Sequence, residues 1–421
     1  MRAIAAYEAK QLTFEQLQRE MDASCTESIR RMEDAGHMVV TDGEQRFSPV
    51  ATYPIMDTLN GTGISENLVS DGQYFAMQVR VLSHRHIPIP FFPSVSSVPT
   101  HPSIASVSFP ILHPILFRPF LFRPVPHPNA LQFRFADDYH RRLPRLVSGP
   151  FRYKTFAADY LERALPVSQH LLKQAVVAPS MLSLLYPLRS DIPGYTRQQF
   201  LTDLCDQCEL DIRKCFQAGA VRVSIDFTEG QLTLRNADVR NPWSTSERLL
   251  DFFIDLNNRV INRFTAGERA HIGVHTCPGE MCGDGSVSYE DLVKEMFKLN
   301  AGYFLIHCAS ERDRNRVLKL IGKNIRRDAN GVKQMAYIGA TSAVDPRVES
   351  PEEIAQMLIA ATKYIPADQL GATDDCGFSA GFCDEKKSKQ GMNSDCARDI
   401  AFQKIAARVK GARIASERLG I

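Results

Sequence analysis

Helical periodicity dominates the first part of the chain. Apolar residues recur every three or four positions over 2–35, in a stretch rich in Ala, Glu, Gln and Arg, and Gly36 follows where a C-terminal cap is expected. An apolar run at 37–42 comes next and ends in the acidic turn Gly43-Glu44. This pattern predicts one long helix followed by a short strand.

Helix-like and strand-like patterns alternate from Arg141 onward. Helices are predicted at 156–172, 197–218, 245–265, 288–300, 311–324, 350–363 and 395–417. Short apolar runs predict strands at 174–179, 221–226, 272–277, 303–308, 335–340 and 370–376. Such repetition is typical of a parallel sheet, and polar or sulfur-containing side chains at the ends of the runs are typical of a (β/α)8 barrel.

The predicted barrel is one strand short. The six runs and the run at 37–42 make seven strands, whereas a closed barrel of this type needs eight. The chain starts directly in a helix. We therefore expect an α/β fold, a (β/α)8 TIM barrel that spans 1–421 as a single domain and lacks its first strand upstream of Met1.

Residues 79–132 interrupt this pattern. They contain 11 of the chain's 24 prolines and five of its 11 histidines, but no Asp, Glu, Lys or Gly. Proline removes backbone donors and fixes φ, so continuous helix or sheet is excluded here. One interpretation is a proline-rich, irregular, low-complexity insertion. Because Phe, Leu, Pro, Ser, His, Ile and Val share pyrimidine-rich codons, we favour a second hypothesis, a translated intron.

The bulk composition is that of an ordinary globular protein, with 44% hydrophobic and 23% charged residues and a formal charge of +2. That charge argues against a protein that binds nucleic acid electrostatically. No apolar stretch is long enough for a membrane helix, and the N-terminal residues do not resemble a signal peptide. We therefore expect a cytoplasmic protein whose ten cysteines are free thiols or metal ligands. Nothing in the sequence indicates an oligomeric state.

Two of the predicted strands end in residues that suit a metal ion. His275 and Cys277 are separated by one residue, so in a strand both side chains point to the same face. Cys376 ends a later strand and can reach them if both strands end at one rim of a barrel. One histidine and two cysteines form a ligand set that suits zinc.

A second cysteine pattern carries no predicted chemistry. Cys205 and Cys208 form a CxxC pair, but they lie inside a predicted helix without a second pair nearby. We interpret them as packing residues with partly exposed thiols. The histidines within 79–132 share the interpretation of that segment and are not predicted ligands.

Three motifs, in this order along the chain, resemble the C-terminal catalytic barrel of cobalamin-independent methionine synthase and, more closely, its single-barrel relatives. The motifs are His275-Thr276-Cys277, Asp345-Pro346-Arg347-Val348-Glu349-Ser350-Pro351-Glu352-Glu353-Ile354 and Asp375-Cys376-Gly377-Phe378. The resemblance implies zinc-dependent transfer of a methyl group from 5-methyltetrahydrofolate, carried as a polyglutamate, to the thiol of homocysteine. It implies Zn2+ ligation by His275, Cys277 and Cys376. It also implies that Glu44 and Asp226 contact the amino acid substrate.

The sequence departs from the family at the next strand end. Where the full-length synthases have a glutamate zinc ligand, this chain has His307 followed by Cys308. Either residue is an acceptable zinc ligand, and a hydrogen-bonded core histidine fits the pattern equally well. No motif identifies the general acid that must protonate the leaving amine. Two alternatives stay open: a related zinc-thiolate alkyltransferase with another thiol or donor, and a catalytically inactive barrel.

If the segment 79–132 is a translated intron, the mature messenger RNA will lack the codons from Pro88 to Pro128. Its removal joins the sequence around Phe75 to that around Ala136, and the product has ordinary globular composition. Sequencing of the spliced transcript checks this expectation. A mature message that retains those codons contradicts the intron hypothesis.

Overall fold

The computed structural model describes ten main segments and a few residues near the N-terminus. The described residues are 3, 6–7, 10–46, 59–60, 62–63, 133–134, 140–141, 145–187, 191–230, 248–276, 289–378 and 394–421. The chain divides into two units, residues 1–79 with 129–421 and residues 80–128, and the first unit is described below. The predicted insertion at 79–132 lies outside the described residues, so this insertion and the single-domain assignment stay predictions.

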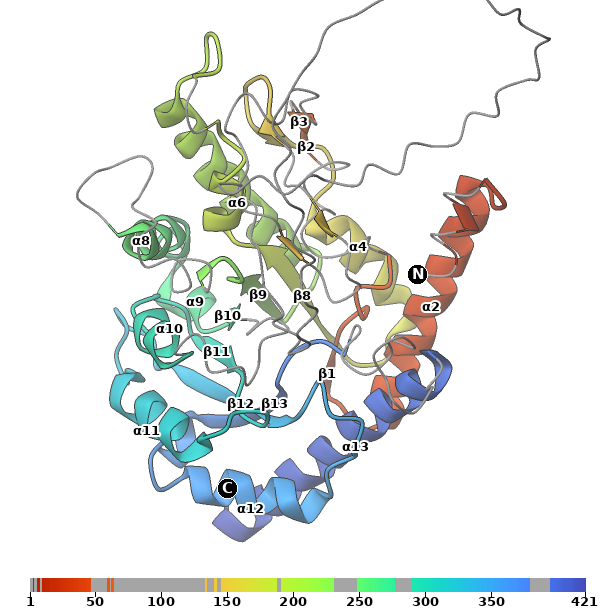
Figure 1. Cartoon of the computed structure of the whole chain (residues 1–421), viewed down its shortest axis with the longest axis vertical. Coiled ribbons are helices and arrows are strands. Elements are labelled where there is room, and N and C mark those ends of the chain that lie inside the picture. The colour runs from red at the N-terminus through yellow and green to blue at the C-terminus, as the bar shows by residue number, and fades with distance from the viewer. Residues whose placement is uncertain are drawn as a thin grey trace, which may run out of the picture. The chain divides into compact units, whose positions relative to one another are not determined.

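Seven parallel strands form one sheet in the described part of the chain. Their order is β1-β8-β9-β10-β11-β12-β13, so each strand pairs with the next member of the set along the chain. The strands are β1 (Val39–Val40), β8 (Leu171–Val177), β9 (Arg222–Asp226), β10 (Ile272–Thr276), β11 (Tyr303–Ile306), β12 (Met335–Thr341) and β13 (Leu370–Asp374). Figure 1 shows the sheet curling with helices on its outer side. The predicted TIM-barrel type of fold is thereby confirmed.

Three short antiparallel pairs lie apart from this sheet. They are β2 (Leu59–Asn60) with β7 (Arg152–Tyr153), β3 (Thr62–Gly63) with β6 (Arg145–Leu146) and β4 (Phe133–Arg134) with β5 (His140–Arg141). The sequence pattern did not predict them, because strands of two residues are too short to show periodicity.

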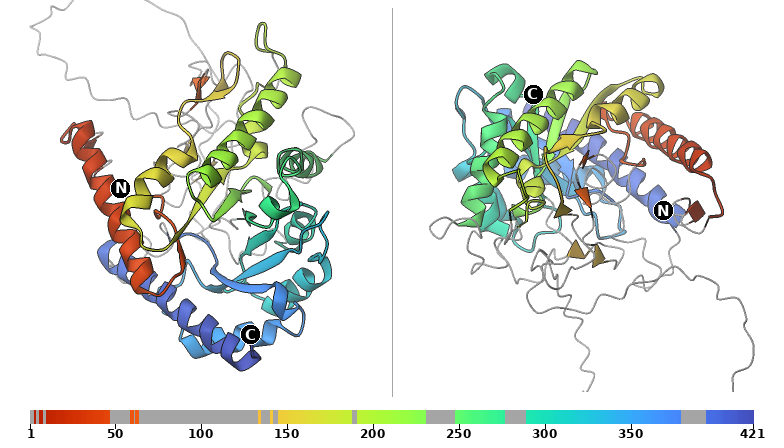
Figure 2. Two further views of the ribbon diagram at one scale, coloured as in Figure 1. Left: turned by 180° about the vertical axis from the view of Figure 1, so that it is seen from behind. Right: turned by 90° about the horizontal axis from the view of Figure 1, so that it is seen from above.

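Helices connect the strands and cover the sheet, as the views in Figures 1 and 2 show. They are α2 (Phe14–Asp34), α4 (Ala157–Ala164), α5 (Pro179–Ser183), α6 (Arg197–Gln217), α8 (Leu249–Ile261), α9 (Ala266–Arg269), α10 (Tyr289–Met296), α11 (Arg314–Asn324), α12 (Pro351–Ala361) and α13 (Ser394–Leu419). Thr13, Thr196 and Ser350 begin their helices with capping boxes, which satisfy backbone donors at both the cap and the third helical position. None of the described helices combines the length and apolar character that a bilayer crossing requires.

Two helix predictions differ from the structure. The predicted helix at 2–35 is interrupted at Lys10, where φ is +59°, and α2 begins only after this turn. The predicted helix at 156–172 breaks down near Pro166, because proline lacks the backbone donor that a continuing helix needs. From Leu171 onward burial alternates residue by residue, so these residues begin β8 instead.

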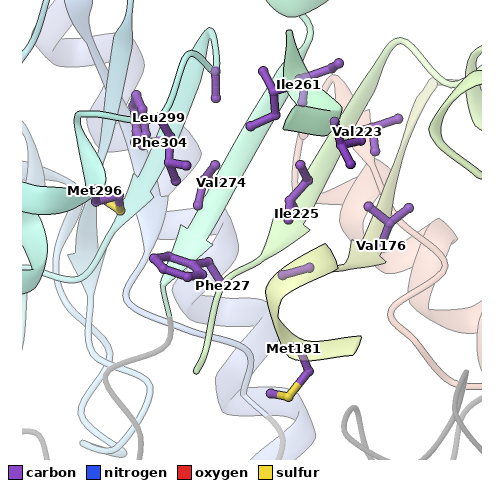
Figure 3. Packing of buried hydrophobic residues seen from close by; sticks show 14 of the residues in the cluster. Val176, Met181, Val223, Ile225, Phe227, Ile261, Val274, Met296, Leu299 and Phe304 are labelled. Carbon is purple, nitrogen blue, oxygen red and sulfur yellow. The ribbon is translucent and has the colours of Figure 1, made fainter. Parts of the chain in front are cut away.

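The outward faces of the strands carry the apolar core. Val223 and Ile225 of β9 and Val274 of β10 are buried and belong to one cluster with Ile261 of α8 and Met296 of α10 (Figure 3). Full burial of such a side chain contributes about 1.5–3 kcal/mol relative to exposure. Packing against the helices therefore holds the strand ends in place.

The CxxC pair of α6 is part of this core. Packing was predicted for Cys205 and Cys208, but these residues are 0% and 3% exposed, so their thiols are buried and not partly exposed as expected. Burial raises the pKa of both thiols. A thiol that resists ionisation is a poor nucleophile and a poor metal ligand.

Aromatic rings fill the other face of the sheet. The ring of Tyr303 covers Gly273, where a Cβ atom would lie 2.0 Å from it, and the ring of Tyr337 covers Gly371 at 2.4 Å. The guanidinium of Arg222 lies 5.4 Å and 5.1 Å from the two ring centroids. The interior is therefore packed with side chains, as in other barrels of this class.

A buried carboxyl group connects two helices to the end of β9. Glu229 is fully buried and hydrogen-bonds with the hydroxyl of Ser180 in α5, and this hydroxyl also lies 3.0 Å from Asn257 Oδ1 of α8. The single proton of the Ser180 hydroxyl cannot serve two acceptors. Both contacts therefore form only when the carboxyl group of Glu229 is protonated and donates its own proton to Ser180 Oγ. Burial raises the pKa of Glu229 to about 8, in agreement with a neutral carboxyl group.

We expect Glu229→Gln to keep the fold and to remove part of the pH dependence of stability. A carboxyl group whose pKa is raised by folding stabilises the folded state below its unfolded pKa, and this contribution is lost as pH rises through the folded pKa. The free energy of unfolding of the wild type should therefore fall by a few kcal/mol between pH 4.5 and about 8, at ~1.4 kcal/mol per pKa unit. Urea unfolding across this range measures the difference. If the free energies of unfolding of the wild type and of Glu229→Gln change with pH in parallel, the carboxyl group of Glu229 is not neutral in the folded state.

Candidate functional site

The predicted site residues that the structure describes gather at the carboxyl ends of the strands. They are Glu44 after β1, Asp226 in β9, His275 in β10, His307 after β11 and Cys376 after β13. Because the strands are parallel, these positions share one edge of the sheet. Cys277, the sixth predicted residue, lies outside the described residues.

Asp226 and His275 form a pair across neighbouring strands. They are opposite each other in the register of β9 and β10, and Asp226 Oδ1 lies 3.3 Å from His275 Nδ1. Their side chains are 15% and 19% exposed, so the pair is largely desolvated but still accessible. The contact assigns the proton of a neutral imidazole to Nδ1 and leaves Nε2 as the basic nitrogen.

Glu44 is held in an unusual turn close to this pair. Its φ is +52°, a costly conformation for a residue with a side chain, and its N–H donates to Asp42 Oδ1 at 2.8 Å. Burial raises the pKa of Glu44, Asp226 and Asp42 raise it further, and Lys173 and His275 oppose the shift. The two predicted substrate-binding carboxylates thus belong to one charged cluster with a lysine and a histidine.

Lys173 is a member of this cluster that the sequence pattern missed. It lies in β8, but the apolar run recognised in the sequence began only at Gln174. Burial lowers the pKa of Lys173, whereas Asp226 and Glu44 raise it. A lysine between two carboxylates compensates charges that would otherwise repel each other in a desolvated place. The sequence signal that could have identified Lys173 is a charged residue at the start of an otherwise apolar run.

His307 is buried between two carboxylates. It is 1% exposed, with Nδ1 3.3 Å from Asp375 Oδ2 and Nε2 3.3 Å from Glu311 Oε1. Burial lowers the pKa of His307, Asp375 opposes this shift, and His275 adds to it. The two imidazoles therefore lie close enough to influence each other's charge.

Asp375 connects the end of β13 to the loop after β11. Its Oδ1 accepts the N–H groups of Cys308 and Ala309, and its Oδ2 accepts that of Ser310, each at 2.7 Å. Cys376 is the next residue, so the same contacts hold its backbone against the loop that carries His307. Asp375 belongs to one of the three sequence motifs, but the motif predicted no role for it.

The described donors suit zinc. His275 has Nδ1 facing the carboxylate of Asp226, which is the arrangement common in zinc-binding histidines, whereas both nitrogens of His307 lie 3.3 Å from a carboxylate oxygen. Cys308 is different, because its side chain lies in the apolar core and burial raises its pKa. Among the residues that the structure describes, no three His, Cys, Asp or Glu side chains are grouped as a metal site. With Cys277 outside them, the predicted ligand set stays a prediction.

A pocket of about 680 Å³ lies between residues 147–150 and the start of α6. None of the strand-end residues described above lines it. The hydroxyl of Tyr195 in this pocket accepts the N–H of Phe151 and donates to Asp203 Oδ2 at 2.6 Å. These contacts give Tyr195 a structural role. No chemical role is assigned to the residues that line the pocket.

Comparison with known proteins identifies similar barrels. A protein named methionine synthase from Thermococcus kodakarensis is 26% identical over 164 residues, which cover 38% of this chain and only 38% of that protein. No family model matches the chain. A B12-independent methionine synthase from a Shewanella species, solved in complex with selenomethionine, matches with a TM-score of 0.59 at 17% identity, over 97% of this chain and 91% of that chain.

A second solved structure is also similar to this chain. The putative vitamin-B12-independent methionine synthase of Listeria monocytogenes matches with a TM-score of 0.56 at 14% identity, over 99% of this chain and 92% of that chain. The predicted resemblance is thereby confirmed: the chain is similar to the B12-independent methionine synthases and has their fold.

Proposed function

We propose that this chain is a zinc-dependent methyltransferase that moves the methyl group of 5-methyltetrahydrofolate to the thiol of homocysteine and so forms methionine. The observation that carries the proposal is the charged cluster of Glu44, Asp226 and His275 at one end of the sheet. The relative named methionine synthase supports it, as does the Shewanella protein solved with selenomethionine. Selenomethionine has the same amino and carboxylate groups as homocysteine and methionine.

Glu44 and Asp226 would bind the ammonium group of the amino acid. Carboxylates in a partly desolvated cluster form charge-assisted hydrogen bonds with such a cation. Asp226 directs Oδ1 to His275, which leaves Oδ2 for the substrate. Lys173 compensates the two carboxylates when no substrate is bound, since Asp226 raises the pKa of Glu44 and Lys173 opposes this.

His275, Cys277, His307 and Cys376 would hold the zinc ion. A thiol with a pKa of ~8.5 is mostly protonated at neutral pH, and bound zinc would supply the positive charge that favours the thiolate of the substrate. Asp226 faces Nδ1 of His275 at 3.3 Å and so orients its ring. The ammonium contact orients the thiol end of the same small molecule.

Two alternatives share part of this description. A related alkyltransferase with another thiol or donor would use the same ligands, whereas an inactive barrel would lack zinc or turnover. Zinc binding separates both enzymes from the inactive barrel, and methionine formation separates the two enzymes. We further propose a cytoplasmic protein without nucleic-acid or membrane partners, built as one barrel domain over 1–421 that is interrupted at 79–132.

The wild-type chain should bind one zinc ion, and Cys277→Ser and Cys376→Ser should each lose it, because a hydroxyl is a much weaker zinc ligand than a thiolate. Metal analysis after dialysis measures the zinc, and chromatography measures methionine formed from homocysteine and methylated folate. Cys396→Ser changes an exposed cysteine of α13 and is the matched control, which should keep zinc and turnover. Stoichiometric zinc in both site variants would refute the ligand assignment.

Glu44→Gln and Asp226→Asn should each raise KM for homocysteine by roughly 10–100-fold, because a hydrogen bond to a charged group is worth about 1.5–3 kcal/mol. Glu44→Gln should lose little activity on 4-mercaptobutyrate, which has the thiol but no amine for this carboxylate to bind, whereas Asp226→Asn should also lose activity on it, because Asp226 orients His275. Steady-state kinetics with the two thiols measures this contrast. Glu352→Gln, which removes an exposed partner of Arg418, serves as the control. Equal losses of Glu44→Gln on both thiols would argue against an ammonium site.

A further inference from the structure

The turn after β1 brings the carboxyl group of Glu44 to the strand ends. Gly43 and Glu44, which follow each other in this turn, have φ values of +68° and +52°. Glycine adopts such values readily, whereas a residue with a Cβ atom keeps them only where its surroundings compensate the cost. Burial raises the pKa of Glu44, and the charges of Asp226 and Asp42 raise it further, so its carboxyl group lies inside the fold and near Asp226. Contacts of the turn must therefore hold the backbone of Glu44.

Asp42 makes the first of these contacts. It is 4% exposed, and its Oδ1 accepts the N–H of Glu44 at 2.8 Å. An aspartate in a turn commonly accepts a backbone N–H two residues further along the chain. Arg46 Nη1 lies 3.8 Å from Asp42 Oδ2, and Arg46 Nε donates to Asp22 Oδ1 of α2 at 2.8 Å. The carboxylate that accepts the N–H of Glu44 thus lies beside a guanidinium that is bound to α2.

Gln45 holds the turn on the other side of Glu44. Its Nε2 donates to the carbonyl oxygen of Gly43 at 2.6 Å. Its Oε1 accepts the hydroxyl of Ser24 in α2 at 2.8 Å and an N–H of Arg398 in α13 at 3.4 Å. The residues before and after Glu44 therefore fix its backbone through side chains that reach two helices.

We propose that Asp42 and Gln45 are positioning residues of the substrate site: they hold Glu44 at its positive φ and so direct its carboxylate to the ammonium group of the amino acid. The proposal rests on the proposed function and adds two residues that act only through Glu44. Without their contacts the backbone of Glu44 would relax to negative φ, which residues with a Cβ atom prefer. Such a rotation moves the Cβ atom and turns the carboxylate away from the cation that Asp226 faces.

Calorimetric binding of L-methionine to the full chain tests this role without turnover, and 4-(methylthio)butyrate, which lacks only the amine, is the matched ligand. Asp42→Ala removes the acceptor of the Glu44 N–H, and Gln45→Met removes the donor to Gly43 with little change of side-chain size. Each variant should weaken methionine binding roughly tenfold, the value of about one hydrogen bond, and leave binding of 4-(methylthio)butyrate within about twofold of the wild type. Wild-type affinity for methionine in either variant would overturn the role of the residue that it replaces.

Asp42→Asn separates the hydrogen bond of Asp42 from its charge. The asparagine oxygen can still accept the N–H of Glu44, so this variant should recover most of the methionine affinity that Asp42→Ala loses. In a Glu44→Gln background, Asp42→Ala should have little further effect, because the carboxylate through which it acts is gone. Glu15→Gln, which removes an exposed ion pair with Arg19 on α2, is the control and should change neither affinity. Equal losses in Asp42→Asn and Asp42→Ala, or a full further loss in the Glu44→Gln background, would contradict the role of Asp42.

Hydrogen exchange separates this inference from the proposed function. The N–H of Glu44 should exchange slowly in the wild type and in Asp42→Asn and faster in Asp42→Ala, because a hydrogen-bonded amide is protected. NMR of the isotope-labelled chain measures this exchange. If the wild type binds no methionine, the proposed function fails, while the amide of Glu44 still tests Asp42. Fast exchange of this amide in the wild type would overturn the role of Asp42 even if Asp42→Ala does not fold, and methionine binding that depends on the amine would leave the proposed function intact.

Discussion

Parallel strands that end at one edge of a sheet bring buried polar groups together, and these groups must satisfy one another because little water reaches them. Here the outer faces of the strands are apolar and the other face is filled by rings such as Tyr303. The strand ends are where charged side chains collect, and two of the carboxylates there have specific counterparts: Asp226 with His275, and Asp375 with the loop of His307. The contacts that close this end of the fold are therefore also those that shape the candidate site.

Much of this arrangement could be predicted from the sequence, because it depends on local periodicity. Buried parallel strands appear as short apolar runs, and the last polar residue of a run, such as Asp226 or His275, marks the functional end. The predictions were wrong where one residue changes the local structure. Pro166 ends a helix that its composition would have continued, and Lys173, which falls between the predicted helix at 156–172 and the predicted strand at 174–179, belongs to β8. Neither error shifts a strand end, so the site prediction did not depend on them.

The role of Asp375 could not be predicted in this way. Its partners are 65 to 67 residues away in the sequence, and its contact with them depends on a glycine in a third strand. Local sequence patterns contain no information about a contact between two strands that depends on a residue in a third strand. The choice between His307 and Cys308 is different, because neighbouring residues of an extended segment point to opposite sides. The structure has Cys308 in the apolar core, so alternation along β11 could have removed it as a ligand.

Asp226 and Asp375 show why residue type alone does not assign a role at this site. Both face Nδ1 of a histidine, but Asp375 also accepts three backbone N–H groups and is 2% exposed. A ligand could use its oxygens only by displacing those bonds and exposing N–H groups that have no water to replace them. Asp226 is 15% exposed and faces its histidine with one oxygen, so the other can accept a donor at little cost. An incoming ammonium group is therefore expected to bind Asp226. The oxygens of Asp375 are already used by the backbone N–H groups of its neighbours, which this side chain orients.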